Sequence, residues 1–449
     1  MPSNPIAAVA PALAEPLTLL AMVACFGALA VGARWPVGVS LAVAAWAGAA
    51  LNGYYLPFRH LVEGAFSYLD PILVIATAMI FMRVLADGGS LDSVGRAVER
   101  SLGTRPLLLL PALMLIVMFP GMMTGSSTAS VLTTGAMAAS IAIGLGLAPP
   151  RAAALVAMGS ILGMVAPPVN IPAMLIGGGI DLPFVGFTGP LAVLAFPLAL
   201  VLAYALGWPL VGRRPVRTAA LEERSGTSPE SASGAGRPSQ AASLPLWRAL
   251  APVAAAAAMM TAPRLWPLSI PDPGLPVVFL VSAAVAVACS GRLSIWRTLT
   301  TAIDEALPVL GILAGVGAFI QVMTLTGGRG WLVAQMLGAP SWALVLAAAV
   351  SLPLFGAISA FGSASVLGVP FLLAFLGRNE VMTAAALSLL ASLGDLMLPA
   401  AIAATLAARV AGVPDRMRVL RLCLLPALLA MAAAVLALLF APALGRLVM

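Results

Sequence analysis

The stretch Gly125-Ser126-Ser127-Thr128-Ala129-Ser130-Val131-Leu132 has a counterpart in the second half of the chain, Gly362-Ser363-Ala364-Ser365-Val366-Leu367. Each copy lies in strongly apolar sequence and is followed by a Gly/Pro break, at 163–168 and at 394–399. Lipid cannot satisfy a broken backbone, so such breaks persist in a membrane only where they line a cavity or are buried in protein. Paired breaks in two hydrophobic halves are typical of transporter binding sites.

The composition predicts a membrane protein. The 449 residues are 61% hydrophobic and 9% charged, whereas soluble domains carry about 25% charged residues. Apolar runs of roughly 17–25 residues recur along the chain, which predicts an all-α polytopic membrane protein with about ten to twelve transmembrane helices.

Several classes of function are disfavoured. The formal net charge is +7, but the arginines are scattered over loops, so nucleic-acid binding is not expected. The sequence contains one His, and it shows no Walker motif, no catalytic Ser/His/Asp set and no cluster of metal ligands. We therefore expect no enzyme activity, no organic cofactor and no use of ATP by this chain.

The chain divides into three segments. Residues 1–212 are predicted to form a first transmembrane repeat and residues 246–449 a second one. Between them, residues 213–245 are rich in Ser, Gly, Ala, Pro and Arg and have no hydrophobic period, which predicts a disordered linker on the cytoplasmic side.

Each repeat has the same predicted order of parts. A spanning helix is followed by a glycine-containing turn, an interfacial arm, a second spanning helix, the Gly/Ser motif and a Pro-broken segment. The arms are predicted at 90–102 and at 329–337. We therefore expect one re-entrant hairpin or broken helix in each half.

The first motif offers a ligand site. A helix that starts near Ser126 would present free N–H groups and the positive end of its dipole, which suit an anionic group such as a carboxylate. Hydroxyls and freed carbonyls also suit Na⁺. The alternative is that the small residues only allow close helix packing.

The two Pro breaks add polar groups at membrane depth. Asn170 follows Pro167-Pro168, and Asp395 follows Gly394, four residues before Pro399. An intramembrane carboxylate is a functional hypothesis by default, and Asp395 could bind Na⁺ or carry a proton. The alternatives are a surface loop for the first break, and for Asp395 an ion pair with Arg409 or a helix cap.

Other charges are weaker candidates. Arg83 and Asp87 lie one helical turn apart, which favours a local ion pair. Glu305 and its neighbour Asp304 follow an amphipathic stretch containing Arg297, so a solvated face is expected there. No arginine in the core specifically marks a dicarboxylate substrate.

At Thr124-Gly125-Ser126-Ser127, 163–168 and the turn Thr324-Leu325-Thr326-Gly327, the chain resembles the large membrane subunit of tripartite ATP-independent periplasmic (TRAP) transporters, in the ion-transporter superfamily. The resemblance extends over residues 16–441. It implies an elevator-type fold with two inverted repeats, located in the bacterial inner membrane. It also implies Na⁺-driven uptake of organic acids such as C4-dicarboxylates, a small four-helix partner subunit and a periplasmic substrate-binding protein.

The residues and the resemblance together give the candidate substrate- and ion-binding residues: Gly125, Ser126, Ser127, Thr128, Pro167, Pro168, Asn170, Gly362, Ser363, Ser365, Gly394, Asp395 and Pro399. Na⁺ is expected at Ser126, Ser127, Ser363 and Asp395, with H⁺ as the other possible coupling ion.

The chain departs from the TRAP pattern in its second half. Ser359-Ala360-Phe361 has no acidic residue, and Met397-Leu398-Pro399 stands where Thr-Pro-Pro is usual. The alternative is therefore a stand-alone Na⁺- or H⁺-coupled carboxylate symporter or antiporter that works without a binding protein.

Overall fold

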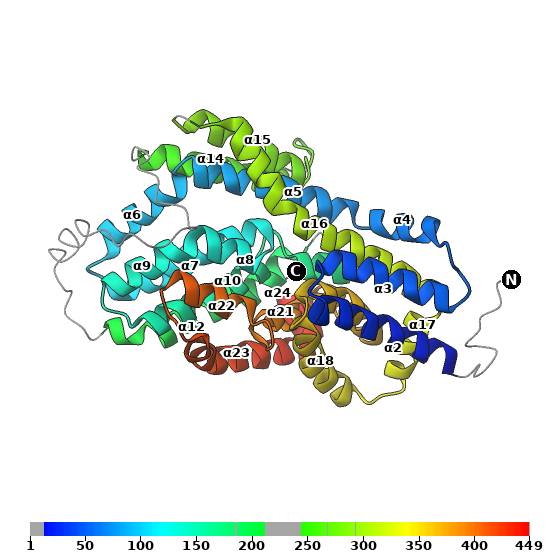
Figure 1. Cartoon of the computed structure of the whole chain (residues 1–449). Helices are drawn as coiled ribbons and strands as arrows, with labels where there is room; N and C mark the ends of the chain where they lie inside the picture. Colours follow the sequence, from blue (N-terminus) through cyan, green and yellow to red (C-terminus); the bar gives the residue numbers. More distant parts are fainter. Residues whose placement is uncertain (1–12, 185, 212–243, 267, 292, 449) are drawn as a thin grey trace.

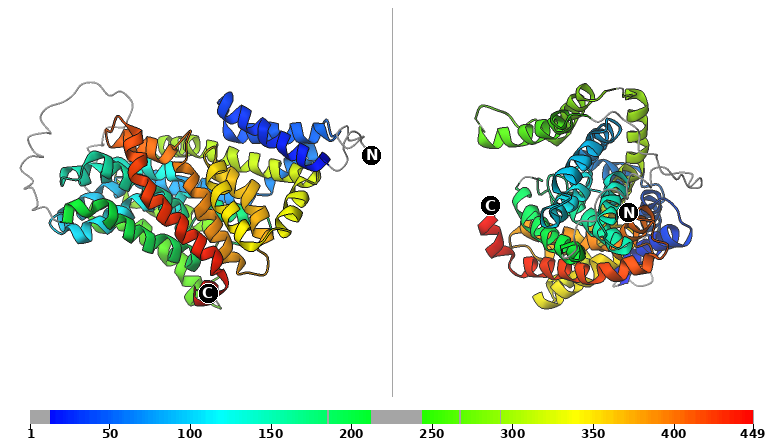
Figure 2. Two further views of the ribbon diagram at one scale, coloured as in Figure 1. Left: turned by 90° about the horizontal axis from the view of Figure 1, so that it is seen from below. Right: turned by 90° about the vertical axis from the view of Figure 1, so that its left-hand side faces the viewer.

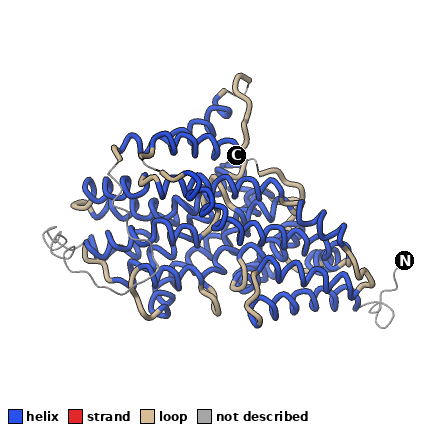
Figure 3. Tube along the Cα trace, turned by 45° about the horizontal axis from the view of Figure 1, so that its top comes forward, coloured by secondary structure: helices blue, strands red, loops and turns tan. Residues whose placement is uncertain are grey.

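The computed structural model describes residues 13–184, 186–211, 244–266, 268–291 and 293–448. Over these residues the chain is helical and contains no β-strand, which confirms the predicted all-α class (Figures 1 and 3). The predicted linker at 213–245 lies almost entirely outside the described residues.

The first half begins with four elements: α2 (Ala14–Gly27), the π-helix η2 (Ala28–Gly32), α3 (Val37–Leu51) and α4 (Phe58–Phe66). The first half continues with α5 (Leu69–Asp87), α6 (Ser90–Leu102), α7 (Pro106–Thr124), α8 (Ser127–Ser130), the π-helix η3 (Val131–Gly135), α9 (Ala136–Gly144), α10 (Pro149–Val165), α11 (Ile171–Gly178) and α12 (Thr188–Val211).

The second half begins with two helices, α14 (Leu246–Leu265) and α15 (Leu275–Cys289). It continues with α16 (Ile295–Leu325), α17 (Gly328–Leu337), α18 (Ser341–Gly356), α19 (Ala360–Ser363), the π-helix η4 (Ala364–Gly368), α20 (Val369–Ala374), α21 (Glu380–Ser392), the 3₁₀-helix η5 (Leu393–Leu396), α22 (Ile402–Val410) and α23 (Arg416–Leu439). Helix α24 (Ala441–Val448) ends the chain.

From α5 to α12 and from α16 to α23 the described helices follow in the same order, except that the 3₁₀-helix η5 has no counterpart between α10 and α11. The arms that the sequence predicts are the helices α6 and α17, and each follows a glycine in the left-handed conformation, Gly89 or Gly327. A π-helical segment follows the motif helix in both halves, and the peptide bonds before Pro168 and Pro399 are cis. The inverted orientation of the repeats stays a prediction.

Seven described helices are long and apolar enough to cross a membrane, as judged by length and composition. Five shorter apolar helices of 10–17 residues accompany them. The sequence predicts about ten to twelve spans because hydropathy does not distinguish a full span from a helix shortened by a break. Both kinds are present, as expected for a multi-pass protein with interrupted helices.

The described helices pack in two groups. In one group, α16 contacts α3, α4 and α5, and α15 contacts α5. In the other group, α10 contacts α7, α12, α22 and α23, and α21 contacts α23. Helices α14 and α15 lie on the opposite side of the molecule from α23 (Figures 1 and 2). The core of the second group is built on α10 and α21, because nearly every residue of these helices is buried.

Close approach of backbones at glycine holds each Pro break against the preceding helix. A Cβ on Gly163 would meet the carbonyl oxygen of Met118 at 2.4 Å, and one on Gly394 would meet the carbonyl carbon of Gly356 at 2.4 Å. Both clashes involve backbone atoms, which cannot move aside as a flexible side chain can.

We predict that Gly394→Ala destabilises the protein by about 1–3 kcal/mol, the usual cost of overpacking a core. Thermal unfolding of the purified chain in detergent measures the effect. Gly311→Ala in α16 is the matched control, because a Cβ there has no atom within 4 Å. An unchanged melting temperature for Gly394→Ala would contradict the close approach.

Candidate functional site

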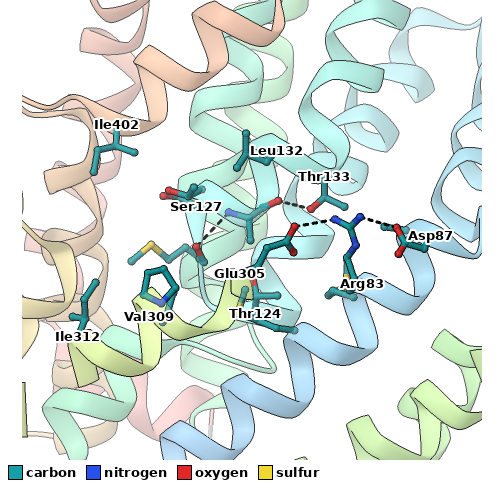
Figure 4. A pocket seen from close by; sticks show the side chains of 18 of the residues that line it. Arg83, Asp87, Thr124, Ser127, Leu132, Thr133, Glu305, Val309, Ile312 and Ile402 are labelled. Carbon is teal, nitrogen blue, oxygen red and sulfur yellow. Dashed lines mark hydrogen bonds and ion pairs between the residues drawn. The ribbon is translucent and has the colours of Figure 1, made fainter. Parts of the chain in front are cut away.

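A cavity of about 940 Å³ lies between the two helix groups. One wall comes from α3, α5 and α16, and we call it the α5–α16 wall. The opposite wall, the hairpin wall, consists of residues at the starts of α8 and α19 together with Met164, Asp395 and Ile402. Figure 4 shows side chains from both walls around this space.

The start of α8 places three predicted site residues on the hairpin wall: Ser126, Ser127 and Thr128. Ser126 is extended, and its side chain accepts a hydrogen bond of 3.3 Å from the backbone N–H of Ala129, which caps the helix. Capping satisfies an N–H that would otherwise have no partner in apolar surroundings. The hydroxyl of the next residue, Ser127, is not used for this cap and points to a partner from the second half of the chain.

That partner is Asp395, which lies in η5 of the second half. The Ser127 hydroxyl donates a hydrogen bond to Asp395 Oδ2. Asp395 is only 9% exposed, and it takes part in none of the ion pairs found among the described residues. The ion pair between Asp395 and Arg409, which is the alternative, is therefore not formed among the described residues. Asp395 lines the cavity as a buried carboxylate with no cationic side chain paired to it there.

The second motif is shifted by several residues relative to its sequence match. Ser359 is the cap of α19 and accepts a hydrogen bond of 3.1 Å from the Gly362 N–H, as Ser126 does for α8. Ser359, not Gly362, is therefore the residue of the second half that corresponds to Ser126 in the first half. Ser359 also lines the cavity. The sequence pattern does not identify Ser359 as the cap, because other small residues follow it within about one turn of helix and match the first motif as well.

Three predicted residues of the second half do not line the cavity: Gly362, Ser363 and Ser365. The hydroxyl of Ser363 donates to the carbonyl of Leu352 at 2.6 Å, and Ser130 makes the equivalent bond to Val117. The Ser365 hydroxyl donates to the carbonyl of Phe361 at 2.7 Å. These hydroxyls satisfy backbone groups, and Ser363 does not join Ser126, Ser127 and Asp395 at the predicted Na⁺ site.

The remaining predicted residues shape the breaks. Gly125 ends α7 in the left-handed conformation, which favours glycine, and a Cβ there would meet Ile171 at 2.5 Å. Asn170 is fully buried: it caps α11 and donates to the hydroxyl of Ser388 at 2.9 Å. Neither residue lines the cavity, and the same holds for Pro167, Pro168, Gly394 and Pro399.

The α5–α16 wall carries a charged cluster that the sequence analysis treats as peripheral. Arg83 pairs with Asp87 at 2.9 Å, as predicted for neighbours one turn apart, and also with Glu305 at 2.8 Å (Figure 4). The Thr298 hydroxyl donates to Asp87 at 2.8 Å. All four residues line the cavity. Glu305 is not simply part of a solvated face, because α16 packs against α5 and brings it to an arginine 222 residues away.

The hairpin wall offers hydroxyl and carboxylate oxygens as ligands for a hard cation. Among the described residues, no group of three or more His, Cys, Asp or Glu side chains is placed to bind a metal ion. The oxygens of Ser126, Ser127 and Asp395 are the hard ligands on the hairpin wall, and such neutral-plus-carboxylate sets suit Na⁺.

Comparison with known proteins agrees with the membrane fold. Residues 6–208 match the model of the Na⁺/H⁺ antiporter family. The solved structure of the YdaH transporter of Alcanivorax borkumensis is similar with a TM-score of 0.56 and 17% identity, covering 86% of this chain and 88% of that one. No curated protein matches.

A second similar structure is that of MtrF from Neisseria gonorrhoeae, described with a class of antimetabolite efflux pumps. Its TM-score is 0.55 at 13% identity, and the match covers 85% of this chain and 83% of that one. The chain therefore has the fold of membrane transporters. These comparisons do not support the assignment to TRAP large subunits.

Cysteine accessibility tests which predicted residues face the cavity. In a background with Cys25, Cys289 and Cys423 changed to Ala, we predict that Thr128→Cys reacts with a membrane-impermeant methanethiosulfonate reagent. Ser363→Cys should stay unmodified, because Ser363 is fully buried and bonded to the preceding helix. Equal labelling of the two variants, measured by mass spectrometry of the purified protein, would contradict the placement of the cavity.

Proposed function

We propose that the protein is a secondary transporter that couples the movement of Na⁺ or H⁺ to the transport of a small organic anion. The observation that carries the proposal is the contact between Ser127 and Asp395. It joins the first-half helix start to the second-half break at the wall of one cavity.

Asp395 supplies the cation chemistry. A carboxylate buried away from water is costly unless a cation or a proton neutralises it. The neighbouring hydroxyls of Ser126 and Ser127 provide oxygen ligands at the place where the negative charge needs compensation. Na⁺ would be held by these three side chains, whereas H⁺ would neutralise Asp395 alone.

The anion has a complementary place. Two uninterrupted helical runs, 127–144 and 360–374, begin at the cavity after the caps Ser126 and Ser359. Their N-terminal ends carry partial positive charge and free N–H groups. A cation at Asp395 would add a full positive charge beside them, so cation binding favours anion binding in the same cavity. This linkage is the thermodynamic basis of coupling.

The helix packing supports a moving-body mechanism. The cavity separates the group built on α10 and α21 from the group of α3, α4, α5, α15 and α16. We propose that the hairpin wall moves with the first group against the α5–α16 wall, as in an elevator. The movement would expose the ligands first to one side of the membrane and then to the other.

Export by exchange is the second candidate. The match of residues 6–208 to a Na⁺/H⁺ antiporter family and the similarity in fold to a protein described with efflux pumps are the reasons to consider antiport as this second candidate. The predicted binding protein and small membrane subunit belong to the import proposal. Co-purification of a stoichiometric small subunit from native membranes would favour import.

We predict that Na⁺ stabilises the purified protein against thermal unfolding relative to an equal concentration of choline, and that Asp395→Asn abolishes this stabilisation. A ligand that binds the folded state raises its stability by mass action. Asp92→Asn is the matched control, because it removes a carboxylate from the same cavity without removing the partner of Ser127.

A companion assay separates the two directions. Proteoliposomes containing a pH-sensitive dye report proton movement after a Na⁺ pulse, and antiport alone would change the internal pH without an organic substrate. Three results together would overturn the proposed coupling. Na⁺ and choline would stabilise the wild type equally, no proton movement would be seen, and stability would not depend on protonation of Asp395.

A further inference from the structure

The charged cluster on the α5–α16 wall faces the hairpin wall but has no part in the cation site. Arg83 Nη1 donates a hydrogen bond of 2.8 Å to Glu305, and Arg83 Nη2 forms an ion pair with Asp87 at 2.9 Å. Its Nε is buried and has no hydrogen-bond partner among the described residues. A guanidinium has five donors in a planar fork, and it binds a carboxylate best through two parallel bonds. Arg83 therefore contacts its two carboxylate partners with fewer hydrogen bonds than its five N–H donors could make.

The two partners of Arg83 are held differently. Asp87 lies one turn away on the same helix and also accepts the Thr298 hydroxyl at 2.8 Å. Glu305 comes from α16, its side chain is 49% exposed, and Arg83 is its one ion-pair or hydrogen-bond partner among the described residues. Releasing Glu305 would cost less than releasing Asp87, because the Glu305 side chain is 49% exposed and the Asp87 side chain 27%.

We propose that Arg83 is the receptor for the carboxylate of the transported substrate, and that this carboxylate replaces Glu305. Asp87 and Thr298 keep the guanidinium in place, while Glu305 is the counter-ion of the empty cavity. The substrate class is a small organic acid that presents a carboxylate to the α5–α16 wall. The inference rests on the proposed function, to which it adds the residue that selects the cargo.

The charges of the cavity explain why such an exchange is needed. Two arginines and four carboxylates line it, so the described lining carries an excess of negative charge: Arg83, Arg297, Asp87, Asp92, Glu305 and Asp395. An organic anion would be repelled unless it met a positive group directly and displaced a negative one. A neutral analogue cannot compete with Glu305 for a guanidinium, so the exchange also rejects amides and alcohols.

The test uses the purified full-length chain and three probes: acetate, benzoate and succinate, as potassium salts. Thermal unfolding is compared with potassium chloride at equal ionic strength and with the corresponding amides. We expect at least one carboxylate, and no amide, to stabilise the wild type. Arg83→Gln should weaken the apparent affinity about tenfold or more, as expected for loss of a charge-assisted hydrogen bond.

Two further variants distinguish loss of the carboxylate site from misfolding and from a general loss of positive charge. Glu305→Gln should bind the carboxylate several-fold more tightly, because the competing counter-ion is gone, and misfolding cannot produce that gain. Arg297→Gln is the matched control: it removes the same charge from the same cavity, and we expect its affinity to stay close to that of the wild type. Retained Na⁺ stabilisation in Arg83→Gln shows that this variant is folded.

Three results would overturn the proposal. These are absence of stabilisation of the wild type by all three carboxylates, equal losses in Arg83→Gln and Arg297→Gln, and weaker binding by Glu305→Gln. Failure of the cation-coupling proposal would be seen separately. In that case Na⁺ would not stabilise the wild type, while the carboxylate response and its dependence on Arg83 would remain.

Discussion

The free N–H groups of two helices that begin inside apolar protein constrain the rest of this structure. Without water or lipid partners, these groups must be satisfied locally. Ser126 and Ser359 each cap the following helix from an extended backbone. Four residues later, Ser130 and Ser363 bond to carbonyls of the preceding helices, at Val117 and Leu352. The helix starts are thereby fixed at the wall of the cavity, with their remaining polar groups turned toward it.

The two walls of the cavity balance their charges by different means. On the hairpin wall, Asp395 accepts the Ser127 hydroxyl and has no cationic side chain paired with it in the part of the chain that the structure describes. On the α5–α16 wall, Arg83 is accompanied by Asp87 and Glu305, so its positive charge is compensated before any ligand arrives. A buried charge without a partner is costly, and the partner of each charge decides which ligand can enter. The carboxylate of one wall and the arginine of the other therefore differ in whether charged side chains of the protein already compensate them.

Local sequence accounts for part of this site. Small polar residues beside helix breakers predict the first tip and the position of Asp395, because such residues are unusual at membrane depth. Asn170 fits the same description, but its side chain caps α11 and does not line the cavity. The pairing of Arg83 with Glu305 had no local signal, since it depends on the packing of α5 against α16. The distinction between a lining hydroxyl and one bonded to a neighbouring carbonyl, as in Ser363, also arises only in the folded chain.

The two halves share an architecture, but they differ at the residue that matters for a cation. After the close-packed glycine of the first break comes Met164, and after that of the second comes Asp395; both line the cavity. Two carboxylates at these places would line the same cavity, and their mutual repulsion would make ionisation of both less favourable. One carboxylate, met by a hydroxyl from the opposite half, avoids this repulsion. Any movement that separates Ser127 from Asp395 would break this hydrogen bond, so the contact depends on how the two halves are arranged.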